Sequence, residues 1–484
     1  MNLIFIILIP FIGIIFCLLH NRIHKISQKW IALFSVVSTL FLTVFELFKK
    51  IQERNFNWIS QFQFPWIPNF GIKFHLSLDN LSFLMIFSTT IVSITAILCS
   101  WKEVKDKEKN FFYTNLLSIF LSTIGIFLAS DLFLFFLFWE ISSISIFFLI
   151  SFWNTNSENS KKKYESAKSF FMYSQMSSAF MFLGILFLVI KQYQTTNILS
   201  FSYFDILKIR LGIWEEYFIM ILFLFSFIIK LPIIPFHGWL VKVQSNSHFS
   251  GTVDLISIII KTSAYAILKI NTKIFPTSSY YIENFMMIFG IINIVYGSVC
   301  ALSHKNIKKI ISYSTISQMG FILIGIYANN RISYKGTIVQ IISYSLCTSG
   351  IIAIFGQIFQ RVKTYNIEEM NFSKKKYYFF YKILGFFLFS YLGIPGSVSF
   401  VGKIMISFGN FFKHPIVSII SIFSFFLSSI YCINILHKVF NIKFIEYSKI
   451  KKIRFLEKFI LLWISFFILI LGVFPNIILN SIEK

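Results

Sequence analysis

The chain has 484 residues, of which 56% are hydrophobic and 13% are charged. The charged fraction is about half that of an average soluble domain, so the composition excludes an ordinary soluble protein and predicts an all-α polytopic membrane protein. The formal net charge is +24. However, the lysines lie in short loops between apolar segments and form no basic face interleaved with aromatic residues, so we expect no nucleic acid among the partners.

Apolar segments long enough to cross a bilayer as helices follow one another along the whole chain. They lie at about 3–19, 30–48, 80–100, 112–129, 132–151, 168–190, 217–238, 250–270, 281–302, 308–328, 336–359, 379–412, 416–437 and 457–474. The segment 379–412 is long enough to be crossed twice or broken. We therefore expect about fourteen transmembrane helices in one membrane domain, residues 1–484.

Lysine and arginine divide the connecting loops into two alternating sets. The richer set comprises the loops around 21–29, 101–111, 152–168, 242, 304–309, 361–382 and 438–458. Because cytoplasmic loops carry the excess of basic residues, this set is predicted to be cytoplasmic, and both termini then face outward. His304, Lys305, Lys308 and Lys309 are assigned to one of these loops.

Two apolar segments contain residues that break helices. The first is "IIKLPIIPFHGW" at 228–239, and the second is "LGIPGSVSFVGK" at 392–403. Proline removes a backbone donor and clashes with the preceding turn, so both helices should kink or unwind there. Unwound backbone at membrane depth is tolerated only where protein or a water-filled cavity surrounds it. A pair of such breaks in corresponding halves is typical of transporters built from inverted repeats.

Four of the charged residues within the apolar segments stand out as candidates for function. Glu140 is in the middle of "FLFFLFWEISSISIFFLI" at 133–150, and Lys230, Lys261 and Lys403 lie within or beside the breaks and small residues. We expect Glu140 and Lys230 to pair, with Ser143 one turn further on the same helical face, and the lysines to form a proton relay. The structural alternatives are a simple salt bridge and, for Lys261 and Lys403, anchors that reach the membrane surface.

Three polar residues near the first break are weaker candidates for supporting roles: His237, His248 and Asp254. The five cysteines are spaced neither for metal ligation nor for disulfides. Nothing in the sequence has the form of a dinucleotide loop, a haem ligand pair or an iron–sulfur cysteine run. We therefore expect no cofactor and no metal on this chain, and no redox chemistry of its own.

Several motifs together resemble a known family. They are "FWEISSISIFFLI", "KLPIIPFHGWL", "SGTVDLISIIIKTSAYAILK", "IKKIISYSTISQMGF" and "GIPGSVSFVGKIMISFG". These stretches are similar to the antiporter-like membrane subunits of respiratory complex I, the NADH–quinone oxidoreductase. Within this family, the sequences at 64–85 and 98–103 resemble one particular type of subunit, one branch of the family. The resemblance implies two inverted five-helix repeats at 112–270 and 281–438, a C-terminal helix at 457–474, and proton translocation driven by quinone reduction elsewhere in the complex.

The resemblance also implies roles for individual residues. Glu140 matches the carboxylate of the fifth helix, Lys230 its partner on the broken seventh helix, Lys261 the central lysine of the eighth, and Lys403 the terminal proton donor. NAD, FMN, iron–sulfur clusters and quinone are then expected on other subunits. The implied partners are the other membrane subunits, especially the sister antiporter-like subunits, and the lipid bilayer. The implied location is the bacterial inner membrane.

The chain departs from the family pattern at four positions. Lys403 stands where this branch usually has glutamate, although its sister subunits have lysine. Gln318 and Tyr344 replace family histidines, and Gln244 lies in "VKVQ" where the family has "PDAH". Either water bridges these gaps or pumping through this chain is weakened, and the sequence leaves both open.

Two other functions remain open at this stage. The chain could belong to a multi-chain sodium/proton antiporter, which shares the lysine–glutamate core, although the stretch 64–85 argues against this. It could also be a scaffold that holds a complex together without conducting protons.

Overall fold

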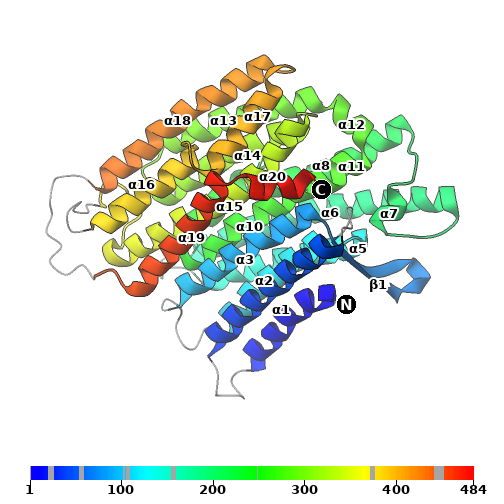
Figure 1. Ribbon diagram of the computed structural model, residues 1–484, viewed down its shortest axis with the longest axis horizontal. Coiled ribbons are helices and arrows are strands. Elements are labelled where there is room, and N and C mark those ends of the chain that lie inside the picture. The colour runs from blue at the N-terminus through cyan, green and yellow to red at the C-terminus, as the bar shows by residue number, and fades with distance from the viewer. Residues whose placement is uncertain are drawn as a thin grey trace. The chain divides into compact units, whose positions relative to one another are not determined.

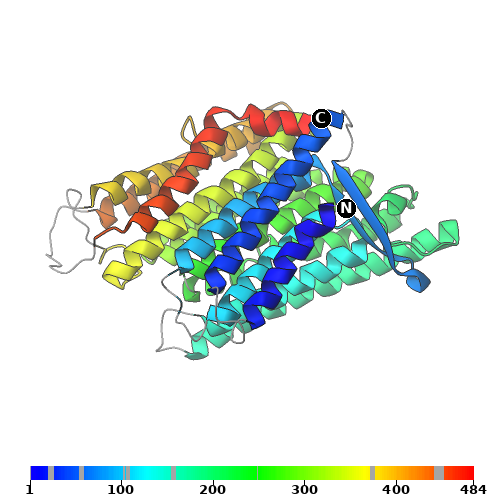
Figure 2. The same cartoon turned by 60° about the horizontal axis from the view of Figure 1, so that its bottom comes forward.

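A computed structural model shows a predominantly helical chain (Figures 1 and 2). It describes the chain except for residues 1, 20–26, 54–58, 102–103, 105–108, 154–159, 248, 371–376, 441–451 and 484, together with the side chains of 50–53, 160, 162–163, 249–257 and 483. The chain divides into two compact units. Unit 1 comprises residues 1–231, 258–282 and 481–484, and unit 2 comprises 232–257 and 283–480.

Unit 1 contains a β-hairpin and the first group of helices. Its helices are α1 (Asn2–Leu19), α2 (Gln28–Glu53), α3 (Asn80–Ser100), α4 (Lys109–Leu128), α5 (Leu132–Phe152), α6 (Ser160–Thr196), α7 (Tyr203–Ile206), α8 (Ile213–Lys230), the π-helical turn η4 (Ile267–Asn271), α11 (Thr272–Ile274) and α12 (Pro276–Tyr281). The hairpin consists of β1 (Ser60–Ile67), the short turn η2 (Pro68–Phe70) and β2 (Ile72–Leu78). Helix α10 (Phe249–Ala266) begins in unit 2 and ends in unit 1.

The regular elements in the described part of unit 2 are all helices. Its helices are α9 (Gly238–Asn246), α13 (Glu283–Ser303), α14 (Ile307–Tyr327), α15 (Arg331–Val362), α16 (Tyr378–Leu392), α17 (Val398–Phe411), α18 (Pro415–Val439), α19 (Phe455–Val473) and α20 (Asn476–Glu483). Within the unit, α13 packs along α14, and α15 packs along α17.

The helices have the length and surface of membrane spans. Among the described residues, eleven helices are long and apolar enough to cross a bilayer, and α16 and α17 are shorter apolar helices. Large apolar side chains face outward on these helices, for example Phe34 and Phe41 on α2, which are 73% and 70% exposed. Apolar side chains cover the outside of a chain that lies in lipid rather than water. The chain is a multi-pass integral membrane protein, whereas the number of fourteen helices and the two repeats stay predictions.

Both expected helix breaks are present. Helix α8 ends at Lys230, and the next helix, α9, begins only at Gly238 after two prolines. Helix α16 ends at Leu392, and α17 begins at Val398. Between them, Gly393 and Gly396 adopt φ angles of +93° and +91°, which only glycine adopts without strain. The prediction of two broken helices is therefore confirmed.

The hairpin β1–β2 is an element that the sequence analysis did not anticipate. Its strands pair antiparallel, with Phe64 opposite Phe74. The hairpin is fixed to the α4–α5 connection, because the Ser130 N–H donates to the His75 carbonyl at 2.9 Å and the Lys73 N–H donates to the Asp131 carboxylate at 3.1 Å. The fold is thus mostly helical with one small sheet.

The loops at one end of unit 2 follow the predicted alternation. Glu368, in the α15–α16 connection, accepts from Lys305 and from Lys438, each at 3.0 Å. Lys305 lies between α13 and α14, and Lys438 lies at the end of α18. Three loops that the sequence assigns to the same side of the membrane therefore meet at one end of this unit.

Candidate functional site

Lys230 is buried at the last position of α8. Its side chain is 2% exposed, and its Nζ donates to the hydroxyls of Ser142 and Ser143 at 3.3 and 3.2 Å. The Nζ also lies 3.8 Å from the centre of the Trp139 ring, a cation–π arrangement. The proline break places the lysine here, because α8 cannot continue past Pro232, so its last residue faces α5 inside unit 1.

Glu140 lies near Lys230, but the expected ion pair between the two side chains is wrong. Its Oε2 accepts from the Gln175 amide of α6 at 3.1 Å, and its buried Oε1 has no hydrogen-bond partner in the described part of the chain. Ser143 rather than Glu140 contacts Lys230, because the carboxylate points from an adjacent face of α5 toward α6. The two groups are nevertheless close enough for their charges to interact without direct contact.

Lys261 is buried in the second half of α10. Its side chain is 1% exposed, and its Nζ donates to the Ser88 hydroxyl of α3 at 3.0 Å. The ammonium group thus points into unit 1 and does not reach toward the surface, so a lysine that anchors the helix at the membrane boundary does not fit this position.

Lys403 is held at the second break. Its side chain is fully buried, and its Nζ donates to the backbone carbonyls of Tyr391 and Leu392, each at 3.0 Å. Because α16 ends there, its last carbonyls lack partners within the helix and carry the negative end of the helix dipole. The break between α16 and α17 therefore creates the acceptor site for this ammonium group.

The supporting candidates have different surroundings. Ser143 contacts Lys230, as described above. His237 directly precedes α9, and its ring packs against Tyr296 with 5.2 Å between ring centres. Its Nδ1 has no hydrogen-bond partner in the described part of the chain. His248 lies outside the described residues, and Asp254 lies in α10 at a position where only the backbone is described.

The residues that replace expected proton carriers are buried in polar contacts. The Gln318 Oε1 accepts from the Gln340 amide at 2.9 Å, and the Tyr344 hydroxyl donates to Thr315 at 3.3 Å. Gln244 is 2% exposed, and its Oε1 has no hydrogen-bond partner among the described residues. Each position thus keeps a polar group inside unit 2, although none of these side chains takes up a proton as readily as histidine.

The sequence analysis missed two buried lysines. Lys308 was assigned to a loop, but it lies in the first turn of α14, 3% exposed, and donates to the Ser247 carbonyl at 2.7 Å. Lys269 is 7% exposed in unit 1, where it donates to the Tyr265 hydroxyl at 2.6 Å and lies 3.6 Å from Asp79. The spacing of Lys261, Tyr265 and Lys269 on one helical face is a signal that could have identified the second lysine.

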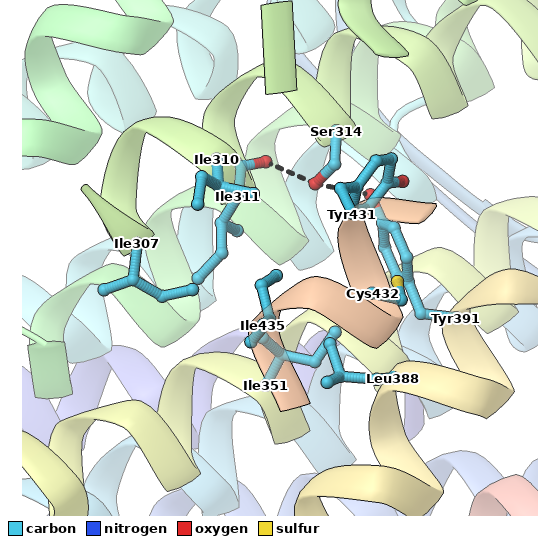
Figure 3. A pocket seen from close by; sticks show the side chains of 10 residues that line it. All are labelled: Ile307, Ile310, Ile311, Ser314, Ile351, Leu388, Tyr391, Tyr431, Cys432 and Ile435. Carbon is cyan, nitrogen blue, oxygen red and sulfur yellow. Dashed lines mark hydrogen bonds between the residues drawn. The ribbon is translucent and has the colours of Figure 1, made fainter. Parts of the chain in front are cut away.

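A small cavity lies close to Lys403 within unit 2. Figure 3 shows aliphatic side chains around it, with Tyr391 and Tyr431 on one side. The Tyr391 hydroxyl donates to Ser314 at 3.2 Å, and the Tyr391 carbonyl is one of the two acceptors for Lys403. Its volume of about 10 Å³ is close to the lower limit for a single water molecule, far below that needed for a quinone or a nucleotide.

The site therefore consists of two separately described groups. Glu140, Lys230 and Lys261 belong to unit 1, and His237, Gln318, Tyr344 and Lys403 belong to unit 2. In both groups buried ammonium groups are held mainly by hydroxyls, carbonyls and aromatic rings. This arrangement suits the binding and release of protons better than the binding of a small molecule.

Comparison with known proteins places this chain beside a family of membrane subunits. A family model described as the membrane part of NADH:quinone oxidoreductase and Mrp antiporters matches residues 129–430. The NADH-quinone oxidoreductase subunit M of Buchnera aphidicola subsp. Schizaphis graminum is 41% identical, over 98% of this chain and 95% of that protein. Subunit M is the branch to which residues 64–85 and 98–103 point.

Solved structures have the same fold. A chain of respiratory complex I from Thermus thermophilus superposes with a TM-score of 0.87, at 18% identity, over 99% of this chain and 97% of that chain. A chain of the Mrp complex from Dietzia sp. DQ12-45-1b superposes with a TM-score of 0.84, at 16% identity, over 98% and 95% of the two chains.

Proposed function

Because this chain belongs to the family of NADH:quinone oxidoreductase and Mrp antiporter membrane subunits, we propose that it is the proton-translocating subunit M of an NADH–quinone oxidoreductase. Protons move through its buried lysines, and quinone reduction elsewhere in the complex drives them. Relatives that are 41% and 39% identical, each over 98% of this chain, carry the name of this subunit.

The observation that carries the proposal is the way Lys230 and Lys403 are buried. Both side chains are at most 2% exposed and lie beside helix breaks, and their described contacts are neutral acceptors and aromatic rings. Burying a charge inside a membrane is costly, so a buried ionisable side chain points to a function. A lysine held by neutral acceptors can release its proton without leaving a contacting carboxylate unpaired, so both of its protonation states are accessible.

The proposed route uses the residues in the order of the family resemblance. Protons enter near Lys230, pass to Lys261 and leave through Lys403. Glu140 modulates the proton affinity of Lys230 through its charge and couples the chain to a neighbouring subunit. Ser143 supports Lys230 directly, and His237, His248 and Asp254 support the route around the first break. Lys403 serves as the terminal donor in place of the glutamate usual for this branch.

The same proposal assigns the cofactors, the partners and the location of the chain. NAD, FMN, iron–sulfur clusters and quinone are bound by other subunits, and this chain holds no cofactor or metal. Its partners are the other membrane subunits and the surrounding lipid. The lysine-rich loops lie in the cytoplasm of a bacterial cell, and both termini lie on the outer side of the inner membrane.

Purification of the chain with its native partners tests this proposal. A tagged chain should copurify with subunits that contain flavin and iron–sulfur clusters. The complex, reconstituted in vesicles, should build up a membrane potential during NADH-driven quinone reduction. Companions that are all membrane chains without redox centres would contradict the assignment and would favour the sodium/proton antiporter, for which the fold shared with the Mrp complex is the supporting observation.

The scaffold remains the third possibility, because histidines of the family pattern are absent at Gln318 and Tyr344. If the chain is a scaffold, a complex in which Lys261 is replaced should assemble and pump normally. If the chain conducts protons, the same replacement should abolish pumping.

A further inference from the structure

One buried carboxylate of unit 2 has no part in the route described so far. Glu283 is the first residue of α13, and its side chain is 5% exposed. Its Oε2 accepts from Lys413 at 2.5 Å and from the Asn329 amide at 2.9 Å, and its Oε1 lies 2.5 Å from the His414 Nε2. These four residues, here called the Glu283 cluster, join the start of α13 to the α14–α15 and α17–α18 connections.

The cluster lies between the interior of unit 2 and its surface. The exposed fraction of the side chains rises from 5% for Glu283 to 16% for His414 and 42% for Lys413. Histidine can both accept and donate a proton, which makes it a common proton shuttle. The loops involved belong to the lysine-poor set, which the charge distribution assigns to the outer side.

A polar stripe on α17 runs from Lys403 toward this cluster. Lys403, Ser407 and Asn410 are spaced at i, i+4 and i+7, which places them on one face of the helix. Ser407 and Asn410 are each 1% exposed. The Ser407 hydroxyl lies 2.8 Å from that of Ser421 on α18. One turn nearer the start of α18, Ser418 donates to the His414 carbonyl at 3.2 Å.

Two buried acceptors, one on the stripe and one on the neighbouring helix α15, have no hydrogen-bond partner among the described residues. They are the Oδ1 of Asn410 and the Oε1 of Gln340. Gln340 packs directly against Gly402, the neighbour of Lys403. Both side chains are 1% exposed, and buried polar groups of this kind are commonly satisfied by internal water. The stripe therefore has the polar character that a hydrated path requires.

We propose that the Glu283 cluster accepts protons from Lys403 along the Ser407–Asn410 stripe and releases them at this end of unit 2. The proposal rests on the proposed function and names the outlet of its route. The flexible stem of Lys403 moves from the Tyr391 and Leu392 carbonyls toward Ser407, and its ammonium loses one proton. Each hydroxyl or water on the way gives up one proton as it receives another. The His414–Glu283 pair gains a proton and then loses it to the solvent beside Lys413.

The alternative is that the cluster only fastens three helix ends together. Measurements on the assembled complex in membrane vesicles separate the two, with NADH-driven proton flux and quinone reduction recorded together. The variants are Glu283→Gln and His414→Gln, which keep polar side chains but do not titrate near neutral pH. We expect proton flux to fall about tenfold or more, as for loss of a positioned acid–base group, and Glu283→Asp to restore part of it.

Glu368→Gln is the matched control, because Glu368 likewise forms two ion pairs, with Lys305 and Lys438, but at the opposite end of α18 in the same unit. It should pump like the unchanged chain. If Glu283→Gln fails to assemble, His414→Gln decides alone. The inference is overturned if the assembled variants pump like the control. In that case a loss of pumping in Lys403→Met would leave the proposed route standing with a different outlet, and normal pumping in Lys403→Met would overturn the route as well.

Discussion

A buried ammonium group must be compensated by its immediate neighbours, and in this chain hydroxyl groups provide much of that compensation. Lys230 has Ser142 and Ser143, and Lys261 has Ser88. A hydroxyl can accept from the charged lysine and can also donate to the neutral one. Serine therefore suits a lysine that changes its protonation state, whereas a directly bound carboxylate would hold it in the charged form.

The serines that contact Lys230 can be tested by substitution. A chain with Ser142→Ala and Ser143→Ala loses two hydrogen bonds to a charged group, each worth about 1.5–3 kcal/mol, so we expect quinone-linked pumping to fall about tenfold or more. The matched control is Ser145→Ala, since Ser145 lies on the same helix but bonds to Ser118 at 2.7 Å. Equal activity of the double variant and the control would show that these hydroxyls do not matter.

At this scale, the sequence predicts which residues are buried better than which residues touch. Lys230, Lys261 and Lys403 are recognisable because a charge within an apolar segment is rare. The partner of Lys230 was predicted wrongly, because the face of α5 that meets it is set by packing between helices. Lys308 was missed because it lies close to a histidine and two further lysines, a composition typical of a loop. Only the fold shows that the first turn of α14 is buried.

At the scale of helices and strands, the ends of helices position the chemistry. The break after α16 supplies the carbonyls that hold Lys403, and the end of α8 places Lys230 against α5. Proline and glycine indicate both breaks in the sequence. The hairpin also left a signal, since "IKFHLSL" at 72–78 alternates polar and apolar residues with the period of a strand. The search for apolar segments passed over it because the strands are too short and polar to span a membrane.

Close packing of α15 on α17 depends on glycine. A Cβ on Gly402 would lie 2.9 Å from the backbone N and Cα of Gln340. Because a backbone cannot move aside as a side chain can, Gly402→Ala should destabilise the chain by about 1–3 kcal/mol. Gly385→Ala is the control, since its Cβ would meet only the flexible end of Leu436, at 3.1 Å, and a more distant ring atom. Thermal unfolding of the purified complex compares the two, and equal midpoints would contradict this account of the packing.

Asp131 holds the start of α5 and the hairpin together. Its carboxylate accepts from three backbone N–H groups, but burial raises its pKa from the usual value of 3.8 to about 6. The folded chain therefore binds more protons than the unfolded chain between these two values, and this residue lowers stability as the pH rises through that range.

The variant Asp131→Asn keeps an acceptor for the start of α5 without the charge. We expect it to unfold at a higher temperature than the unchanged chain at pH 7.5, and the difference to disappear near pH 4. A difference that stays the same at both pH values would show that burial of this carboxylate is not the cause.

At the scale of the whole molecule, the distribution of lysine and arginine predicts the orientation in the membrane. Within unit 2 the prediction fits the contacts, because loops of one set meet around Glu368 and loops of the other set meet around Glu283. Which of these ends faces the cytoplasm depends on the charge rule alone. The prediction of internal repeats likewise rests on the resemblance to the family. The two halves differ in sequence, and the paired helix breaks are the sequence feature that they share.

The orientation can be measured with single cysteines and a thiol reagent that does not cross membranes. Phe412→Cys should react in intact spheroplasts, since position 412 is 94% exposed at the end predicted to face outward. Glu369→Cys should react only after the membrane is opened. The unchanged chain gives the background from its own cysteines, and the reverse labelling pattern would invert the proposed topology.

Proton flux through a complex that contains Lys261→Met tests the central claim most directly. Methionine fills nearly the same volume and carries no titratable group, and the Lys261 side chain is only 1% exposed. The account predicts an assembled complex whose NADH-driven membrane potential and quinone reduction are both strongly reduced. An assembled Lys261→Met complex that pumps as many protons per NADH as the unchanged complex would contradict it.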